Sequence, residues 1–276
     1  MEKVLEYVNN SFESAEEQAA FDVYDANNIN PLYGFFVARA GLGASESMRS
    51  KLAEYNDPRL SRAFITKQGT SGKEQAPGTA DNAVYAPNGT PEQGTSKYGT
   101  SLFMYSISAP TLLLSYHELK FLEAEALCRL ERDAKSALKD AVVAGLLNAE
   151  NSFTISRKEL GKTLINAASN ITEAEAESYF DNTIEAKYTA EPLKTTMTQK
   201  YFALWGASGE ATESYNDVRR MKGLGENFIE LKNPNSFPLR CPYGNSDTTT
   251  NAEVKAAYGN GQYVYSENVW WAGGSR

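Results

Sequence analysis

The sequence predicts an all-α, mainly helical protein with long irregular loops. Apolar residues recur at helical spacing in several segments, and strand-like alternation is scarce, with residues 262–264 offering only a fragment. Pairs that fit the capping box, in which a hydroxyl and a carboxylate satisfy backbone N–H groups at a helix start, precede several of these segments. The 276 residues are also enough to bury a substantial core.

Local signals place the helices in order along the chain. The first capping box pairs Ser14 with Glu17. Residues 48–55 predict a short helix that ends before Asp57-Pro58, because proline disfavours a helical conformation in the residue before it. Two further boxes, Ser156 with Glu159 and Thr172 with Glu175, predict later helix starts. Apolar residues at helical spacing then follow at Ala176, Tyr179, Phe180 and Ile184, and again at Met197, Tyr201, Leu204 and Trp205.

The segment from Ser115 to Leu130, SYHELKFLEAEALCRL, is apolar on two sides of a helix. One face carries Leu119, Leu122, Ala126, Leu127 and Leu130, and another carries Phe121, Ala124 and Cys128. A helix with two apolar faces is expected between neighbours. The next segment, residues 133–147, repeats the pattern with alanine and glycine at the seam. The two segments predict a helical hairpin of tetratricopeptide type, and such hairpins bury both faces only by stacking.

Glu118 and Glu125 lie seven residues apart, on one line between the two apolar faces. A buried carboxylate must be paired or hydrogen-bonded, so we expect structural ion pairs there, with Asp217, Arg219 and Arg220 as candidate partners. The alternative for the two arginines is that they bind an anionic substrate, because the planar guanidinium matches a carboxylate. A glycosidase-like carboxylate pair would need an open cleft, which the flank of a packed helix does not provide. His117, the one histidine, is expected to be packed and hydrogen-bonded.

Composition argues against several classes of function. Asp and Glu number 35 against 27 Lys and Arg, a net charge of −8, whereas a nucleic-acid binder would normally show a basic face. One histidine and two separated cysteines, Cys128 and Cys241, provide neither a multi-histidine metal site nor a disulfide framework. No apolar run reaches the roughly 18 residues of a membrane span. We therefore expect no cofactor, no metal site and no nucleic-acid partner, whereas 35 acidic residues leave a catalytic carboxylate pair open.

Two segments break the helical pattern. Residues 66–100 are rich in Gly, Pro, Thr and Ser and predict a loop insert, and residues 233–276 predict an irregular C-terminal segment. The loop carries Tyr85 and Tyr98, which form either a binding platform or pins that hold a surface loop.

Four landmarks in order resemble the SusD/RagB family of outer-membrane nutrient-binding lipoproteins, in its SusD-like starch-binding branch. They are NDPRL (56–60), YHELKFLEAEAL (116–127), QKYFALWGASGEATESYNDVRRMKG (199–223) and FPLRCPYGNSDTTTN (237–251), followed by NVWW (268–271). The resemblance covers a single SusD-like region over residues 1–276, corresponding to the C-terminal half of a longer family member. Signal peptide and lipid anchor are then expected outside this chain.

The resemblance implies a surface-exposed lipoprotein of the outer membrane that binds an oligosaccharide or another nutrient without catalysis. It further implies delivery of the ligand to a SusC-like TonB-dependent transporter as partner. The alternative is a helical-repeat scaffold that binds a protein partner and no small ligand.

Aromatic and amide side chains in the irregular segments are the candidate ligand-binding residues. Sugars present apolar C–H faces that stack on aromatic rings, and amide groups reach their hydroxyls. In the loop the candidates are Asn82, Tyr85, Asn88 and Tyr98, and near the C-terminus they are Trp270 and Trp271. The competing interpretation is that the two tryptophans pack the C-terminal segment onto the helices.

Overall fold

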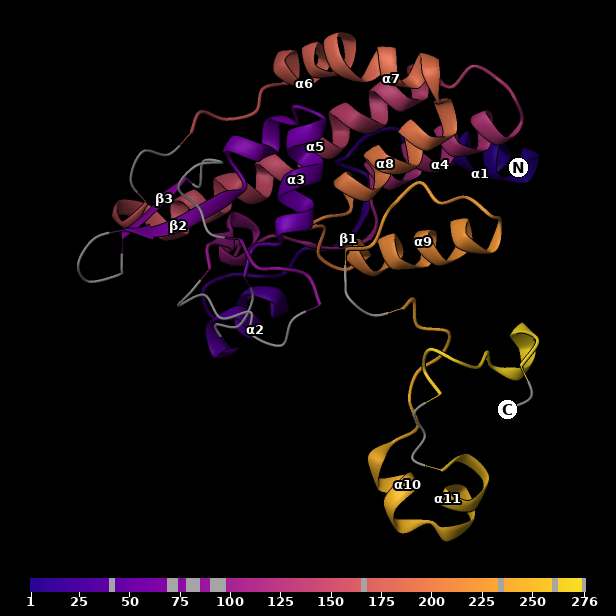
Figure 1. Ribbon diagram of the computed structural model, residues 1–276. Helices are drawn as coiled ribbons and strands as arrows, with labels where there is room; N and C mark the ends of the chain where they lie inside the picture. The colour runs from indigo at the N-terminus through magenta and orange to yellow at the C-terminus, as the bar shows by residue number, and fades with distance from the viewer. Residues whose placement is uncertain are drawn as a thin grey trace. The chain divides into compact units, whose positions relative to one another are not determined.

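The structure, a computed structural model, describes residues 1–39, 43–68, 74–77, 85–89, 98–164, 168–232, 236–259 and 263–274. The chain divides into two compact units (Figure 1). We call Met1–Leu231 the helical unit and Lys232–Arg276 the C-terminal unit, and describe each by itself.

The described residues are mainly helical, which confirms the all-α prediction. The helical unit contains α1 (Glu2–Val8), α2 (Pro31–Arg39), α3 (Glu46–Glu54), α4 (Tyr116–Arg129), α5 (Lys135–Leu160), α6 (Glu173–Tyr179), α7 (Glu185–Ala190), α8 (Pro192–Ala203) and α9 (Glu213–Gly223). Its strands are β1 (Ala19–Phe21), β2 (Phe64–Gln68), β3 (Glu74–Pro77), β4 (Thr100–Ser101) and β5 (Thr111–Leu114). The C-terminal unit contains α10 (Asn245–Thr250) and α11 (Ala252–Tyr258).

Helices α4 and α5 form a hairpin in the middle of the helical unit (Figure 1). Both apolar faces of α4 are buried: Phe121 and Ala124 are fully enclosed on one side, as are Leu119 and Ala126 on the other. The helix begins at Ser115, whose hydroxyl accepts the Glu118 N–H at 3.0 Å. The prediction of a helix between neighbours is therefore confirmed.

Helix α8 packs against both α4 and α5, and α6 packs along α5. At the α5–α8 contact, a Cβ added to Gly145 would lie 2.9 Å from the Cβ of Ala203, so the two helices approach closely because position 145 has no side chain. Helix α6 continues through one π-helical turn, residues 180–184, into α7. The Thr172 hydroxyl accepts the Glu175 N–H at 3.2 Å, so the predicted helix start is confirmed, whereas the Glu175 carboxylate accepts from Arg62 at 2.9 Å.

The NDPRL segment ties α3 to α8. The Asp57 carboxylate accepts hydrogen bonds from the Arg59 side chain at 2.7 and 2.8 Å, and also from the Arg59 N–H. A third guanidinium bond runs from Arg59 to the Phe202 carbonyl at 2.7 Å. Because Arg59 is only 2% exposed, these bonds compensate a buried charge at the end of α8.

Two small antiparallel sheets complete the helical unit. Strand β1 pairs with β5, and the second sheet has the order β3-β2-β4. The β1–β5 pairing places residues 13–18 next to the start of α4, where the Gln18 side chain accepts the Tyr116 N–H at 3.2 Å.

Two of the predicted helix starts are wrong. Residues 13–18 form turns rather than a helix, although Glu17 accepts a hydrogen bond from the Glu13 N–H at 2.8 Å. Ser156 lies inside α5, where its hydroxyl donates to the Ser152 carbonyl one turn earlier at 2.9 Å. The segment predicted as a loop insert, residues 66–100, contains the end of β2, all of β3 and the first residue of β4.

Candidate functional site

The loop candidates are engaged with the helical unit. Tyr98 is 8% exposed, which leaves little ring surface for a ligand. Tyr85 is half-buried, with its ring edge-on to Phe64 at 5.1 Å and the Arg49 guanidinium 5.7 Å from its centroid. Asn88 uses its carbonyl oxygen to accept hydrogen bonds at the start of α3, from the Ser45 hydroxyl and the Ser47 N–H. Asn82 lies outside the described residues.

The two C-terminal tryptophans present open rings. Trp270 and Trp271 are 70% and 69% exposed, and their rings lie perpendicular at a centroid distance of 5.5 Å. By contrast Trp205, in the helical unit, is half-buried with its ring against Phe64 and Phe103, which places it at the edge of the core. Among the predicted ligand-binding residues, the C-terminal pair alone is largely exposed on its aromatic faces.

The carboxylates of α4 are buried and paired. Lys200, 2% exposed, places its ammonium 2.9 Å from Glu118 and 2.8 Å from Asp217. Although burial opposes it, the pKa of Lys200 is raised because both carboxylates favour its charged form. Burial raises the pKa of Glu118 to about 7, despite the neighbouring Lys200.

His117 lies beside these groups and is 1% exposed. Its Nε2 stands 3.8 Å from Glu210, which is longer than a hydrogen bond, so the expected hydrogen bond at this atom is not seen. Burial, with the positive charges of Arg59 and Lys200, lowers the pKa of His117 to about 3. The imidazole is therefore neutral at physiological pH.

A second ionic group lies at the end of α4. Glu125 is 4% exposed and accepts from Arg220 at 2.8 Å and from Arg129 at 2.6 Å. Arg220 also reaches Asp217 at 2.8 Å, which links this group to Lys200. Although burial opposes it, hydrogen bonds from both arginines hold the pKa of Glu125 below its ordinary value.

Arg219 differs from its neighbour. It is exposed, its guanidinium lies 5.8 Å from the ring centroid of Tyr215, and it takes part in none of the ion pairs found among the described residues. Of the three candidate partners, Arg220 and Asp217 therefore form ion pairs with buried groups, and Arg219 does not.

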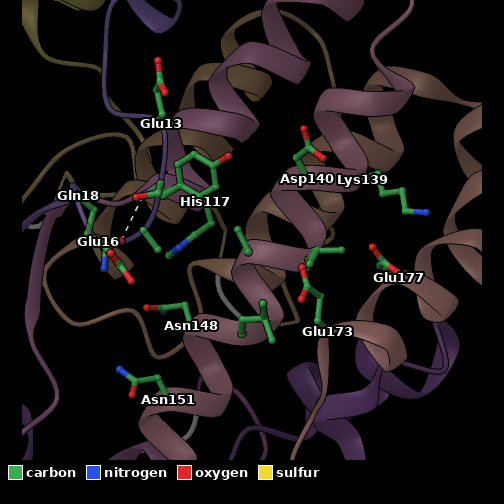
Figure 2. A pocket seen from close by; sticks show the side chains of 16 residues that line it. Glu13, Glu16, Gln18, His117, Lys139, Asp140, Asn148, Asn151, Glu173 and Glu177 are labelled. Atoms are coloured by element: carbon green, nitrogen blue, oxygen red, sulfur yellow. Dashed lines mark hydrogen bonds between the residues drawn. The ribbon is translucent and has the colours of Figure 1, made fainter.

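A groove of about 530 Å³ runs along the outer face of α5 (Figure 2). We call it the acidic groove. We call its half-buried apolar stretch, Val143, Ala144 and Leu147, the floor, and Tyr116 and His117 at the start of α4 also line the groove. The remaining lining residues are Glu13, Ser14, Ala15, Glu16, Gln18, Lys139, Asp140, Asn148, Asn151, Glu173 and Glu177.

Carboxylates dominate the rim of the acidic groove. Glu13, Glu16, Asp140, Glu173 and Glu177 are all exposed, and none belongs to an ion pair found in the described part of the chain. The ammonium of Lys139, which also lines the groove, donates hydrogen bonds to the two carboxylate oxygens of Asp181 at 2.8 and 3.0 Å. No cluster of three or more potential metal ligands occurs within the described residues. The excess of carboxylates makes the rim electronegative.

Sequence reasoning missed this groove because its rim comes from three separate segments. Ser14 and Glu17 predict a helix start, and the acids of α5 and α6 resemble an ordinary solvated helix face. The i,i+4 pair Glu173 and Glu177 was the one local signal, since like charges at that spacing repel.

None of the described helices combines the length and the apolar character that a membrane-spanning helix needs.

Comparison with known proteins gives consistent matches. A SusD-like family model described as "Starch-binding associating with outer membrane" matches residues 1–243. A crystal structure of a SusD/RagB family protein from Bacteroides thetaiotaomicron is 65% identical, with a TM-score of 0.90, and the match covers 100% of this chain and 59% of that one. A SusD homolog from Bacteroides fragilis shares the fold at 19% identity and a TM-score of 0.62, over 92% of this chain and 57% of that one. No curated protein matches the chain.

These matches confirm the resemblance that the sequence landmarks predict. They also show that the chain spans less than two thirds of the length of these two solved structures.

Proposed function

This chain belongs to the SusD/RagB family, and from that membership we propose that it serves non-catalytic glycan binding at the bacterial outer-membrane surface. The observation that carries the proposal is the match over residues 1–243 to a family described as starch-binding and associated with the outer membrane. In this proposal the protein is a surface-exposed lipoprotein that passes its ligand to a SusC-like TonB-dependent transporter.

We assign the glycan contact to Trp270 and Trp271. Their exposure supports this choice, because a pyranose ring stacks its C–H face on an open aromatic face. The perpendicular arrangement offers two ring faces in different planes, which suits successive sugar units of an oligosaccharide better than one flat sheet. Tyr85 and Asn88 are kept as secondary contacts at the loop edge.

Titration with a panel of soluble oligosaccharides tests the proposal. We expect Trp270→Ala and Trp271→Ala each to weaken binding by roughly three- to tenfold, since aromatic contacts contribute about 0.5–1.5 kcal/mol and 1.4 kcal/mol is tenfold in affinity. The matched control is Tyr7→Ala, which removes another exposed aromatic ring, 65% exposed, from α1. Calorimetric titration measures the affinities, and a reducing-sugar assay on the same samples should detect no hydrolysis.

Absence of binding to every oligosaccharide in the panel would overturn the proposal of glycan binding. Release of reducing sugar would overturn the proposal that the protein is non-catalytic. Unchanged glycan affinity in the Trp270→Ala/Trp271→Ala double variant would show that the glycan binds at another surface.

The acidic groove favours a second candidate, a helical scaffold that binds a protein partner without a small ligand. Under this alternative the oligosaccharide panel gives no binding while a polypeptide occupies the groove.

A further inference from the structure

The acidic groove follows α5 over a length that matches several turns of a second helix. Its α5 lining residues run from Lys139 to Asn151, twelve steps along the helix and about 18 Å at 1.5 Å per residue. They repeat every four residues, as Lys139, Val143, Leu147 and Asn151 and as Asp140, Ala144 and Asn148. A helix laid along this face would meet a matching row, and the small Ala144 permits close approach of its backbone.

The floor favours an aliphatic occupant over a sugar. Val143, Ala144 and Leu147 offer branched and small aliphatic groups, whereas a sugar face is best met by an aromatic ring. Tyr116 and His117, both from the start of α4, are the aromatic side chains among its lining residues, and none comes from α5. Leucine-sized side chains projecting from a helix would bury against the floor and remove it from water.

The rim requires positive charge from the occupant. Glu13 and Glu16 stand on one wall and Glu173 and Glu177 on the opposite wall, with Asp140 between them on α5 (Figure 2). Lys139 pairs with Asp181, and Lys139 and Lys120 also lie near enough to act on Asp140. Glu13, Glu16 and Glu173 belong to no ion pair found among the described residues, so the rim keeps an excess of negative charge. Lysine or arginine side chains on both flanks of a central apolar stripe would neutralise both walls at once.

We propose that the acidic groove docks an amphipathic α-helix with an apolar stripe flanked by Lys or Arg, supplied by a polypeptide other than these 276 residues. Recognition follows the helix-in-groove mode, with aliphatic anchors on the floor and charge pairs at the rims. This inference is independent of glycan binding at the C-terminal tryptophans.

The test uses a fluorescein-labelled 18-residue peptide with a leucine–alanine stripe and lysines on both flanks, titrated with the full 276-residue chain. Fluorescence anisotropy should show saturable binding that weakens as salt rises. A peptide with glutamate in place of lysine, and one with two central prolines that prevent a helix, should not bind.

Two charge-reversal variants locate the site. Glu173→Lys/Glu177→Lys removes one wall and should weaken peptide binding at least tenfold. Glu6→Lys/Glu54→Lys makes the same change in net charge at exposed glutamates on α1 and α3, and should leave affinity within about twofold. Ala144→Phe fills the floor and should abolish binding without any change in charge, with circular dichroism confirming that each variant is folded.

Equal losses in both charge-reversal variants would overturn the proposal, because binding would then reflect net charge alone. Lack of binding by the lysine peptide would also overturn it. Displacement of the peptide by an oligosaccharide would overturn it as well, because the groove would then be a sugar site. Self-association of the chain that disappears in the Glu173→Lys/Glu177→Lys variant would also overturn it, because a second copy of the chain would then occupy the groove.

Discussion

Lys200 holds two carboxylates inside the helical unit. Its ammonium contacts Glu118 and Asp217 at 2.9 and 2.8 Å while the side chain is 2% exposed. Removing such a charged group from water is unfavourable, and its two ion pairs offset this cost only while both partners stay in place. Arg220 reaches Asp217 from the other side, so Glu118 depends on Lys200 more strongly than Asp217 does.

At pH 8, above the Glu118 pKa of about 7, we expect Lys200→Met to lower the free energy of unfolding by about 3–5 kcal/mol, because Glu118 must then either stay charged without its countercharge or take up a proton. Lys194→Met is the matched control. It is the same substitution on the same helix, but the Lys194–Glu191 pair is 40% and 59% exposed and should contribute little to stability. Urea denaturation followed by circular dichroism measures both. Equal effects would show that Lys200 is not a structural cation.

At the scale of elements, α4 shows what local sequence predicts well. Its two apolar faces and its Ser115 cap follow from spacing and residue type alone. Two further N–H groups at its start donate to side chains that are distant in the sequence. The Ser115 N–H donates to Glu210 at 2.6 Å, and the Tyr116 N–H donates to Gln18 at 3.2 Å. These long-range caps could not be predicted, since they depend on where other segments fold.

The wrong helix starts have the same origin. Ser156 and Glu159 have the spacing of a cap, but the residues before them are already helical, so the hydroxyl turns back to Ser152. Strand β1 pairs with β5 about 90 residues later, and three-residue strands leave little alternation to detect.

The candidate site was predictable to a similar extent. The tryptophan pair stands out from sequence because the two rings are adjacent. The acidic groove exists only where residues 13–18, α5 and α6 meet, and no local pattern indicates that meeting.

Gly145 tests the packing of α5 on α8. Gly145→Leu should lower the melting temperature by an amount equivalent to about 1–3 kcal/mol, because even its Cβ would stand 2.9 Å from Ala203 and the helices must separate. Gly223→Leu is the control in the last turn of α9, where a Cβ meets nothing within 4 Å, and should be neutral or slightly stabilising. Equal melting temperatures for the two variants would contradict the close contact.

For the whole molecule, the buried groups at the start of α4 make stability depend on pH in two opposing ways. Glu118 has a pKa of about 7 in the folded chain against an ordinary 4.5, so the folded state binds the extra proton between these values and stability falls as pH rises. His117 has a pKa of about 3 against an ordinary 6.5, so the unfolded state binds the extra proton and stability falls as pH drops. Between pH 4.5 and 6.5 the two effects oppose each other.

Single variants should separate these opposing contributions. With Glu118→Gln the histidine contribution remains, and the free energy of unfolding should rise with pH between 4.5 and 6.5. With His117→Asn the glutamate contribution remains, and the free energy should fall over the same range, each proton accounting for at most about 1.4 kcal/mol per pH unit. Urea titrations at half-unit pH steps measure how the free energy of unfolding of each variant changes with pH. Because all other carboxylates titrate in both variants, the difference between the two pH dependences reports on Glu118 and His117. Parallel pH profiles for the two variants would mean that neither group is held in its neutral form by burial, and that the start of α4 is open to water.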